Sequence, residues 1–223
     1  MTIQKVVIIG TGGFGREVLD VLETINQVEE QYDILGFVTE PGYHKPGEQI
    51  NDKPVLGYYD WLEQHKDQVR AICGVGATAT RRRLIQQAEH LGVRFFSAVH
   101  PRAITTRWIT LGTGSIITAG CILTNNIAIG SHVHLNLDAT VGHDVVIEDF
   151  VTVSPGVHIS GNVRLEQGSF IGTGANLIES KTVGAWSVVG AGSVVVNDIP
   201  ANSTAVGIPA KVIKSRNPGW HLE

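Results

Sequence analysis

The chain has 223 residues, a formal net charge of −4 and an isoelectric point near 6.1; 43% of its residues are hydrophobic but only 6% aromatic, which indicates cores of branched aliphatic side chains. The length allows one large domain or two small ones, and the lack of a basic stripe argues against a nucleic-acid or membrane-surface binder. No apolar run reaches the roughly 18–20 residues that span a bilayer, and "MTIQKVVIIG" lacks a signal-peptide layout, so we expect a cytoplasmic protein with neither a nucleic-acid nor a membrane partner.

Residues 1–100 alternate short apolar strands with helices, which predicts a Rossmann-like α/β domain with a small parallel sheet. The expected strands are 5–10, 33–39 and 69–75, and the expected helices are a short one in "YYDWLEQHK" and longer ones at 14–25 and 80–92. Residues 40–54 form a turn-rich stretch after the second strand.

Gly10, Gly12 and Gly15 form a GxGxxG pattern between the first strand and the first helix, which is the context of a phosphate-binding turn. An NAD site would add an acid after the second strand to hold the ribose, and Glu40 is the candidate. However, about 100 residues give only half of a doubly wound dinucleotide fold, which argues against NAD. Residues 74–76, after the third strand, lie at the same edge of the sheet and could contact a nucleotide.

Arg81, Arg82 and Arg83 stand together at the start of the third helix. They could bind phosphate, or they could form the polar face that a surface helix needs. We favour the solvated surface.

From about residue 104 the sequence changes to a period of six. Every sixth residue from Leu111 to Val195 is Ile, Leu or Val, and the residue four places further on is nearly always small or branched, with Lys181 as the exception. Such hexapeptide repeats build a solenoid β-helix, in which three hexads close a triangular coil and the coils stack about 4.8 Å apart. We predict a β-helix domain over 101–212 and a C-terminal tail over 213–223.

The stretch "TVGHD" (140–144) places a histidine and an acid inside this regular pattern. His143 takes the third place of its hexad, so an exposed corner residue is the plain alternative to a functional one. Because adjacent residues of a flat strand point to opposite faces, His143 and Asp144 could act together only at a bend. Histidine suits proton removal at neutral pH, and a carboxylate can fix its tautomer. His143 is therefore the candidate general base and Asp144 its partner.

The whole sequence resembles the bacterial sugar acetyltransferases of the NeuD/PglD type. The resemblance rests on "IIGTGGFGREVLDVL", "GFVTE", "VHPRA", "VGHD" and the closing "VGAGSVVVNDIPANSTAVGIPAKVI". It implies a left-handed β-helix, a homotrimer with active sites between subunits, and acetyl-CoA as co-substrate without a metal. It also implies that a sugar amine, relieved of a proton by His143, attacks the thioester directly.

The resemblance implies two sets of binding residues. In similar transferases the glycine loop holds the diphosphate of a nucleotide-sugar, which implies these substrate-binding residues: Gly10, Thr11, Gly12, Gly13, Phe14, Thr39, Glu40, Gly74, Val75 and Gly76. The implied acetyl-CoA-binding residues are Asn136, Thr152, Gly161, Thr173, Gly190, Ala191, Pro209, Ala210 and Lys211. Lys214 and Arg216 are less specific candidates, for which exposed tail charges are the favoured explanation.

Two departures from the family pattern leave the substrate open. Members close to the bacillosamine-pathway enzymes carry a second histidine where this chain has Thr152. Many relatives carry two acids where this chain has Thr39 and Glu40. The sugar and the nucleobase therefore stay open.

The favoured function is N-acetylation of a nucleotide-linked amino-deoxysugar, and the main alternative is O-acetylation of a sialic acid or another sugar, since His143 would serve either nucleophile. A γ-type carbonic anhydrase would need three zinc-binding histidines at a subunit interface. This chain offers His132, His134, His143 and His158, none of which stacks on another in an eighteen-residue coil. A nonenzymatic nucleotide-binding scaffold is the third class.

Overall fold

The computed structural model describes residues 3–222 and divides into two compact units, with the boundary between Pro101 and Arg102. Residues 1, 2 and 223, which the expected domains include, lie outside the described residues. None of the helices within 3–222 combines the length and apolar character that crossing a membrane requires.

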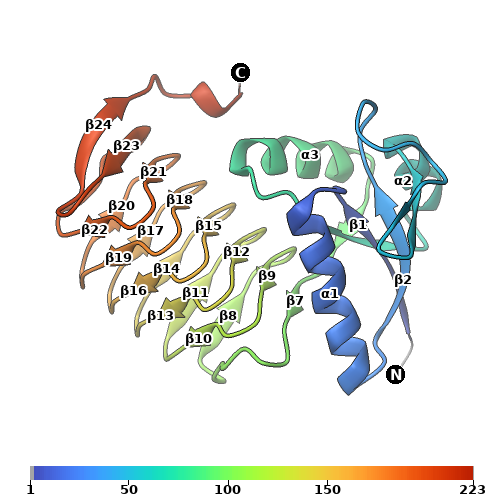
Figure 1. Ribbon diagram of the computed structural model, residues 1–223, viewed down its shortest axis with the longest axis horizontal. Coiled ribbons are helices and arrows are strands. Elements are labelled where there is room, and N and C mark those ends of the chain that lie inside the picture. The colour runs from blue at the N-terminus through green and yellow to red at the C-terminus, as the bar shows by residue number, and fades with distance from the viewer. Residues whose placement is uncertain (1–2, 223) are drawn as a thin grey trace. The chain divides into compact units, whose positions relative to one another are not determined.

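The first unit is built on one sheet with the strand order β3-β4-β2-β1-β5-β6 (Figure 1). Its parallel strands are β1 (Gln4–Ile9), β2 (Tyr32–Val38), β4 (Lys53–Gly57), β5 (Arg70–Cys73) and β6 (Arg94–Phe95). The turn-rich stretch 40–54 also contains a short antiparallel pair, formed by β3 (Gln49–Ile50) and the start of β4. The pair is short and carries Pro54, so its sequence favours a turn over a strand.

Three helices accompany this sheet: α1 (Gly13–Val28), α2 (Tyr59–His65) and α3 (Thr78–His90). The apolar positions of α1 recur at helical spacing and are buried, as are the consecutive aliphatic residues Val6–Ile9 of β1. A last short strand, β7 (Ala98–Val99), is not part of this sheet and stands near the end of the unit in the sequence. The core of the unit thus holds the ends of β1 and β5 in place beside the start of α1.

The second unit is a parallel β-helix whose strands form three flat faces (Figure 1). The β13 face consists of β10 (Ile122–Leu123), β13 (Thr140–Val141), β16 (His158–Ile159), β19 (Asn176–Leu177) and β22 (Val194–Val195). The β14 face consists of β8 (Ile109–Leu111), β11 (Ile127–Ile129), β14 (Val146–Ile147), β17 (Arg164–Leu165) and β20 (Thr182–Val183). The β12 face consists of β9 (Ile116–Ile117), β12 (His134–Leu135), β15 (Thr152–Val153), β18 (Phe170–Ile171), β21 (Val188–Val189) and β23 (Ser203–Val206).

The interior of the β-helix is filled by the aliphatic side chains that recur every six residues. All of them from Ile117 to Val195 are buried, while Leu111, in the first coil, is half-buried. From β8 to β22 the strand registers join each residue to the one eighteen positions further on, for example Thr140 to His158. The period of six therefore predicted both the coil and its core.

The corners of the β-helix require residues with a positive backbone φ angle. One residue in six, from Gly114 to Gly192, has a positive φ, and most of these residues are Gly, Asn or Asp. These three types enter the left-handed region at least cost. Gly, Asn or Asp at most of these positions is therefore a second pattern with a period of six, and it indicates where the chain bends.

The tail predicted over 213–223 is partly wrong. A strand, β24 (Lys211–Ser215), crosses its expected start and pairs antiparallel with β23, and a 3₁₀ turn, η1 (Trp220–Leu222), follows. The His221 ring stacks on Trp186 with centroids 3.6 Å apart, and Arg216 lies over the Trp220 ring. Most of this segment therefore folds onto the β-helix.

Candidate active site

His143 and Asp144 lie at the corner between β13 and β14. Asp144 has φ 58°, so the chain turns sharply there and the two neighbouring side chains meet instead of pointing apart. The His143 Nδ1 and Asp144 Oδ2 atoms are 2.8 Å apart, and both side chains are exposed. The chain therefore bends where His143 and Asp144 need it to bend in order to act together.

The electrostatics of the corner suit a base and its orienting acid. Asn126 donates a hydrogen bond from Nδ2 to Asp144 Oδ1 at 3.2 Å. Hydrogen bonds from His143 and Asn126 hold the pKa of Asp144 below its usual value, so this carboxylate is charged at neutral pH. A proton on Nδ1 of His143 satisfies the bond to Asp144 and leaves the lone pair on Nε2 for an incoming proton.

Gly161 lies one coil further along, directly against the His143 ring. A Cβ atom at Gly161 would be 2.6 Å from both Cε1 and Nε2 of His143. Only glycine leaves room for the imidazole in this position. The eighteen-residue spacing predicts that Gly161, a candidate acetyl-CoA-binding residue, stacks on His143, and the structure adds that this contact leaves no room for a side chain.

The other residues assigned to acetyl-CoA fall into three places. Asn136, Thr173, Gly190 and Ala191 share the corner between the β12 and β13 faces. Thr152 lies in β15 and is buried. The group Pro209, Ala210 and Lys211 lies where β23 turns into β24, and the Ala210 N–H donates to the Val194 carbonyl. The β13 face thus lies between the corner that holds Asn136 and Thr173 and the corner that holds His143.

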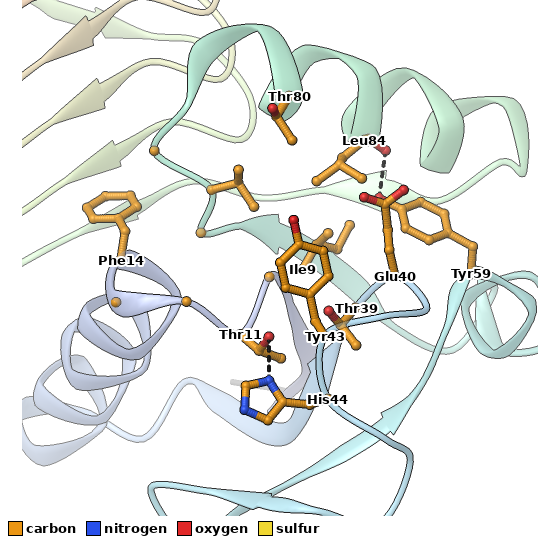
Figure 2. Close-up of a pocket in the computed structure, with 16 residues that line it drawn as sticks. Ile9, Thr11, Phe14, Thr39, Glu40, Tyr43, His44, Tyr59, Thr80 and Leu84 are labelled. Carbon is orange, nitrogen blue, oxygen red and sulfur yellow. Dashed lines mark hydrogen bonds between the residues drawn. The ribbon is translucent and has the colours of Figure 1, made fainter.

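All ten residues that the sequence assigned to the nucleotide-sugar line one cavity of about 260 Å³ in the first unit. The cavity lies at the carboxyl ends of β1, β2 and β5, beside the N-terminus of α1 (Figure 2). Free N–H groups at a helix start attract phosphate. The sequence analysis missed six further lining residues: Ile9, Tyr43, His44, Tyr59, Thr80 and Leu84.

Close backbone contacts explain the glycines of this turn. Gly10 has φ 103°, and a Cβ at Gly15 would lie 2.2 Å from the Gly10 carbonyl oxygen. A Cβ at Gly74 would lie 2.6 Å from the Gly15 Cα. The ends of β1 and β5 and the first turn of α1 are therefore in direct contact, and this contact shapes the floor of the cavity.

The expectation that the three arginines of α3 form a solvated surface is wrong for Arg81. Its side chain is fully buried, and Nη1 donates to the carbonyl oxygens of Val75 and Gly76, each at 3.3 Å. Burial lowers the pKa of Arg81 to about 10, so it remains charged at neutral pH. Arg83 instead forms a bidentate pair with Glu40, with both N–O distances 2.8 Å, and this pair holds the pKa of Glu40 below its usual value. Both arginines thus support walls of the cavity.

No three His, Cys, Asp or Glu side chains lie close enough to share a metal ion anywhere in residues 3–222. Among the four histidines weighed as zinc ligands, His132 stacks on Phe150, and His158 Nδ1 lies 2.8 Å from Thr140 Oγ1. His143 is paired with Asp144.

The coil geometry and the exposed His–Asp corner, with a Rossmann-like unit before them, define a hexapeptide-repeat acyltransferase. The PglD N-terminal domain family matches residues 5–88. GDP-perosamine N-acetyltransferase of Escherichia coli is 29% identical over 218 residues, which make up 95% of this chain and 96% of that protein.

Solved structures match over the full length. A mutant of perosamine N-acetyltransferase from Caulobacter crescentus, in complex with CoA and GDP-perosamine, gives a TM-score of 0.87 at 29% identity and covers 96% of this chain and 99% of its own. The acetyltransferase domain of PglB from Neisseria gonorrhoeae, in complex with acetyl coenzyme A, gives 0.86 at 32% identity and covers 95% and 100%. The chain belongs to this family of PglD-type sugar acetyltransferases.

Proposed function

We propose that the protein transfers the acetyl group of acetyl-CoA to the amino group of a nucleotide-linked amino-deoxysugar. The observation that carries this proposal is the exposed His143–Asp144 pair at a β-helix corner, in a chain whose first unit holds a glycine-lined cavity. The complexes of relatives with CoA, acetyl coenzyme A and GDP-perosamine support both substrates.

In the proposed reaction His143 acts as general base and Asp144 orients it. As the sugar nitrogen forms its bond to the thioester carbonyl carbon, His143 Nε2 takes one proton from that nitrogen. The charge of Asp144 stabilises the imidazolium that results. The tetrahedral intermediate then breaks its carbon–sulfur bond, and the departing sulfur receives the proton from His143 and leaves as the thiol of CoA.

The glycine-lined cavity would hold the nucleotide part of the acceptor. The turn from Thr11 to Gly13 would offer backbone N–H groups to the diphosphate. Thr39 and Glu40 lie at the end of β2, where an acid commonly meets the ribose. The buried Arg81 fixes the carbonyl groups of Val75 and Gly76 and thereby the opposite wall.

We assign acetyl-CoA to the corner of Asn136, Thr173, Gly190 and Ala191, with Thr152 and Gly161 nearby in the coil and the Pro209–Lys211 turn at the nucleotide end. We also infer a homotrimer with active sites between subunits. Support comes from three exposed apolar side chains on or beside the β13 face, at positions that a neighbouring β-helix would cover: Ile122, Leu137 and Ile178. Sedimentation should give three times the 24.0 kDa mass of the chain.

The test is release of CoA thiol from acetyl-CoA with a panel of UDP-, GDP- and dTDP-linked amino-sugars and free sialic acid as acceptors. Wild type should turn over one amino-sugar, and His143→Ala should lose at least about 100-fold in kcat. His90→Ala, which removes an exposed histidine at the end of α3, is the matched control and should keep the wild-type rate.

Three outcomes would contradict the proposal. Turnover of sialic acid alone would replace N-acetylation with O-acetylation. A fully active His143→Ala would remove His143 from the mechanism, and no turnover of any acceptor would favour a nonenzymatic nucleotide-binding scaffold.

A further inference from the structure

We propose that Tyr43 stacks on the nucleobase of the bound nucleotide and that His44 holds Tyr43 in place over the cavity. This inference rests on the proposed function, since it assumes that the cavity of the first unit binds a nucleotide. It assigns a role to part of the turn-rich stretch, residues 41–48 between β2 and β3, here called the strap.

Tyr43 and His44 are the two strap residues that line the cavity. Figure 2 shows the Tyr43 ring in front of Ile9, with the imidazole of His44 beside Thr11. Tyr43 is 74% exposed, and within residues 3–222 its side chain has neither a hydrogen bond nor an aromatic partner. Tyr43 thus presents its ring at a cavity without a packing role in the core.

His44 connects the strap to the glycine turn. Its Nδ1 lies 3.0 Å from the Thr11 hydroxyl oxygen, and Thr11 is itself buried in that turn. On the other side of the strap, the Gly47 N–H donates to the Val55 carbonyl of β4 at 2.8 Å. The strap is therefore fixed at His44 and at Gly47, and Tyr43 directly precedes the first of these points in the sequence.

The position of Tyr43 agrees with where a nucleobase would lie. A diphosphate on the α1 N-terminus places the ribose near the end of β2, which brings the base toward the strap and α3. The nearby walls are the buried Leu84 and Tyr59, whose hydroxyl donates to the Leu84 carbonyl at 2.9 Å. A flat base would then have apolar surface on one side and the Tyr43 ring on the other. Every nucleobase has a π face, so such stacking adds affinity without choosing the base.

The experiment is calorimetric titration of the full-length protein with UDP, GDP and dTDP. For the nucleotide that wild type binds most tightly, Tyr43→Ala should raise the Kd about tenfold, because the stacking surface is lost. Tyr43→Phe keeps the ring and should stay within about twofold of wild type. The melting temperature should not change in either variant, since Tyr43 is exposed.

His44 is tested as a positioning residue. His44→Ala should weaken nucleotide binding several-fold, and His44→Asn should restore it, because the amide nitrogen of Asn can occupy the place of Nδ1 beside Thr11. A purely structural loss would lower the melting temperature of both variants and would not be rescued by Asn.

The outcomes separate this inference from the proposed function. If wild type binds a nucleoside diphosphate and Tyr43→Ala binds it equally well, the stacking role is wrong while the nucleotide site stands. If Tyr43→Phe loses as much affinity as Tyr43→Ala, the hydroxyl matters and stacking is again wrong. If wild type binds none of the three nucleotides, the proposed substrate class fails together with the inference.

Discussion

Asp144 lies at a corner of the β-helix, and it is also the proposed acid that orients His143. The corner needs a residue with positive φ, and Asp, Asn and Gly all accept it. Asp144→Asn should therefore fold normally but lower kcat about 10- to 100-fold, because the amide cannot stabilise an imidazolium as a carboxylate does. Steady-state kinetics and melting curves of the purified variant test this expectation.

Asp144→Ala is the comparison that separates the two tasks. It should lose the same activity and also melt about 2–8 °C lower, since alanine is strained at φ 58°. Equal kcat for Asp144→Asn and wild type would show that the acid serves only the corner.

Gly161 offers a second test at the level of single residues. In Gly161→Ala the new methyl group would overlap the His143 ring, which must then move away from its present position. Because displacements of about 1 Å can cost 100-fold in rate, we expect kcat to fall about 10- to 100-fold. Glu23→Ala, which alters an exposed side chain of α1, is the control and should keep the wild-type kcat in the same kinetic assay. Unchanged kcat in Gly161→Ala would show that the ring can relocate freely.

Among the elements, α3 does more for the nucleotide site than a surface helix would. Its buried Arg81 holds the carbonyl groups of Val75 and Gly76, and Arg83 holds Glu40. Arg81→Met keeps the length of the side chain but leaves both carbonyl groups without this donor. We expect a loss of about 1–3 kcal/mol in the free energy of unfolding and weaker nucleotide binding.

Chemical denaturation and nucleotide titration measure these two effects for Arg81→Met. Gln87→Met alters an exposed side chain of the same helix and serves as the control with near wild-type values. A fully stable Arg81→Met that binds nucleotide normally would show that the loop at 74–76 is rigid without Arg81.

The elements that the sequence predicted are those whose pattern repeats. The step of six from Leu111 to Val195 describes the coil, and the GxGxxG pattern describes the turn of the cavity, because both depend on local spacing. Arg81 was misjudged because its partners lie on a loop five and six residues away, and a helix start gives no local sign of burial. Tyr43 and His44 were missed because an irregular strap has no period; only contacts with Thr11 and the cavity reveal them.

At the scale of the whole molecule, the two proposed binding tasks fall in separate units. All residues assigned to the nucleotide lie before Pro101, and all those assigned to acetyl-CoA and proton transfer lie after it. A β-helix is stabilised mainly by contacts between neighbouring coils, so damage in the first unit should not reach the donor site. Nucleotide binding and acetyl-CoA binding should therefore be lost independently.

Gly15→Ala tests this separation. Its methyl group would lie 2.2 Å from the Gly10 carbonyl oxygen, so the turn must open and nucleotide binding should fall at least about tenfold. Acetyl-CoA binding should stay within about twofold of wild type, whereas Asp144→Asn should keep both affinities and lose only turnover. Glu23→Ala, on the exposed face of α1, should keep all three properties. Titration with each ligand and one kinetic assay measure them, and a parallel loss of both affinities in Gly15→Ala would contradict independent sites.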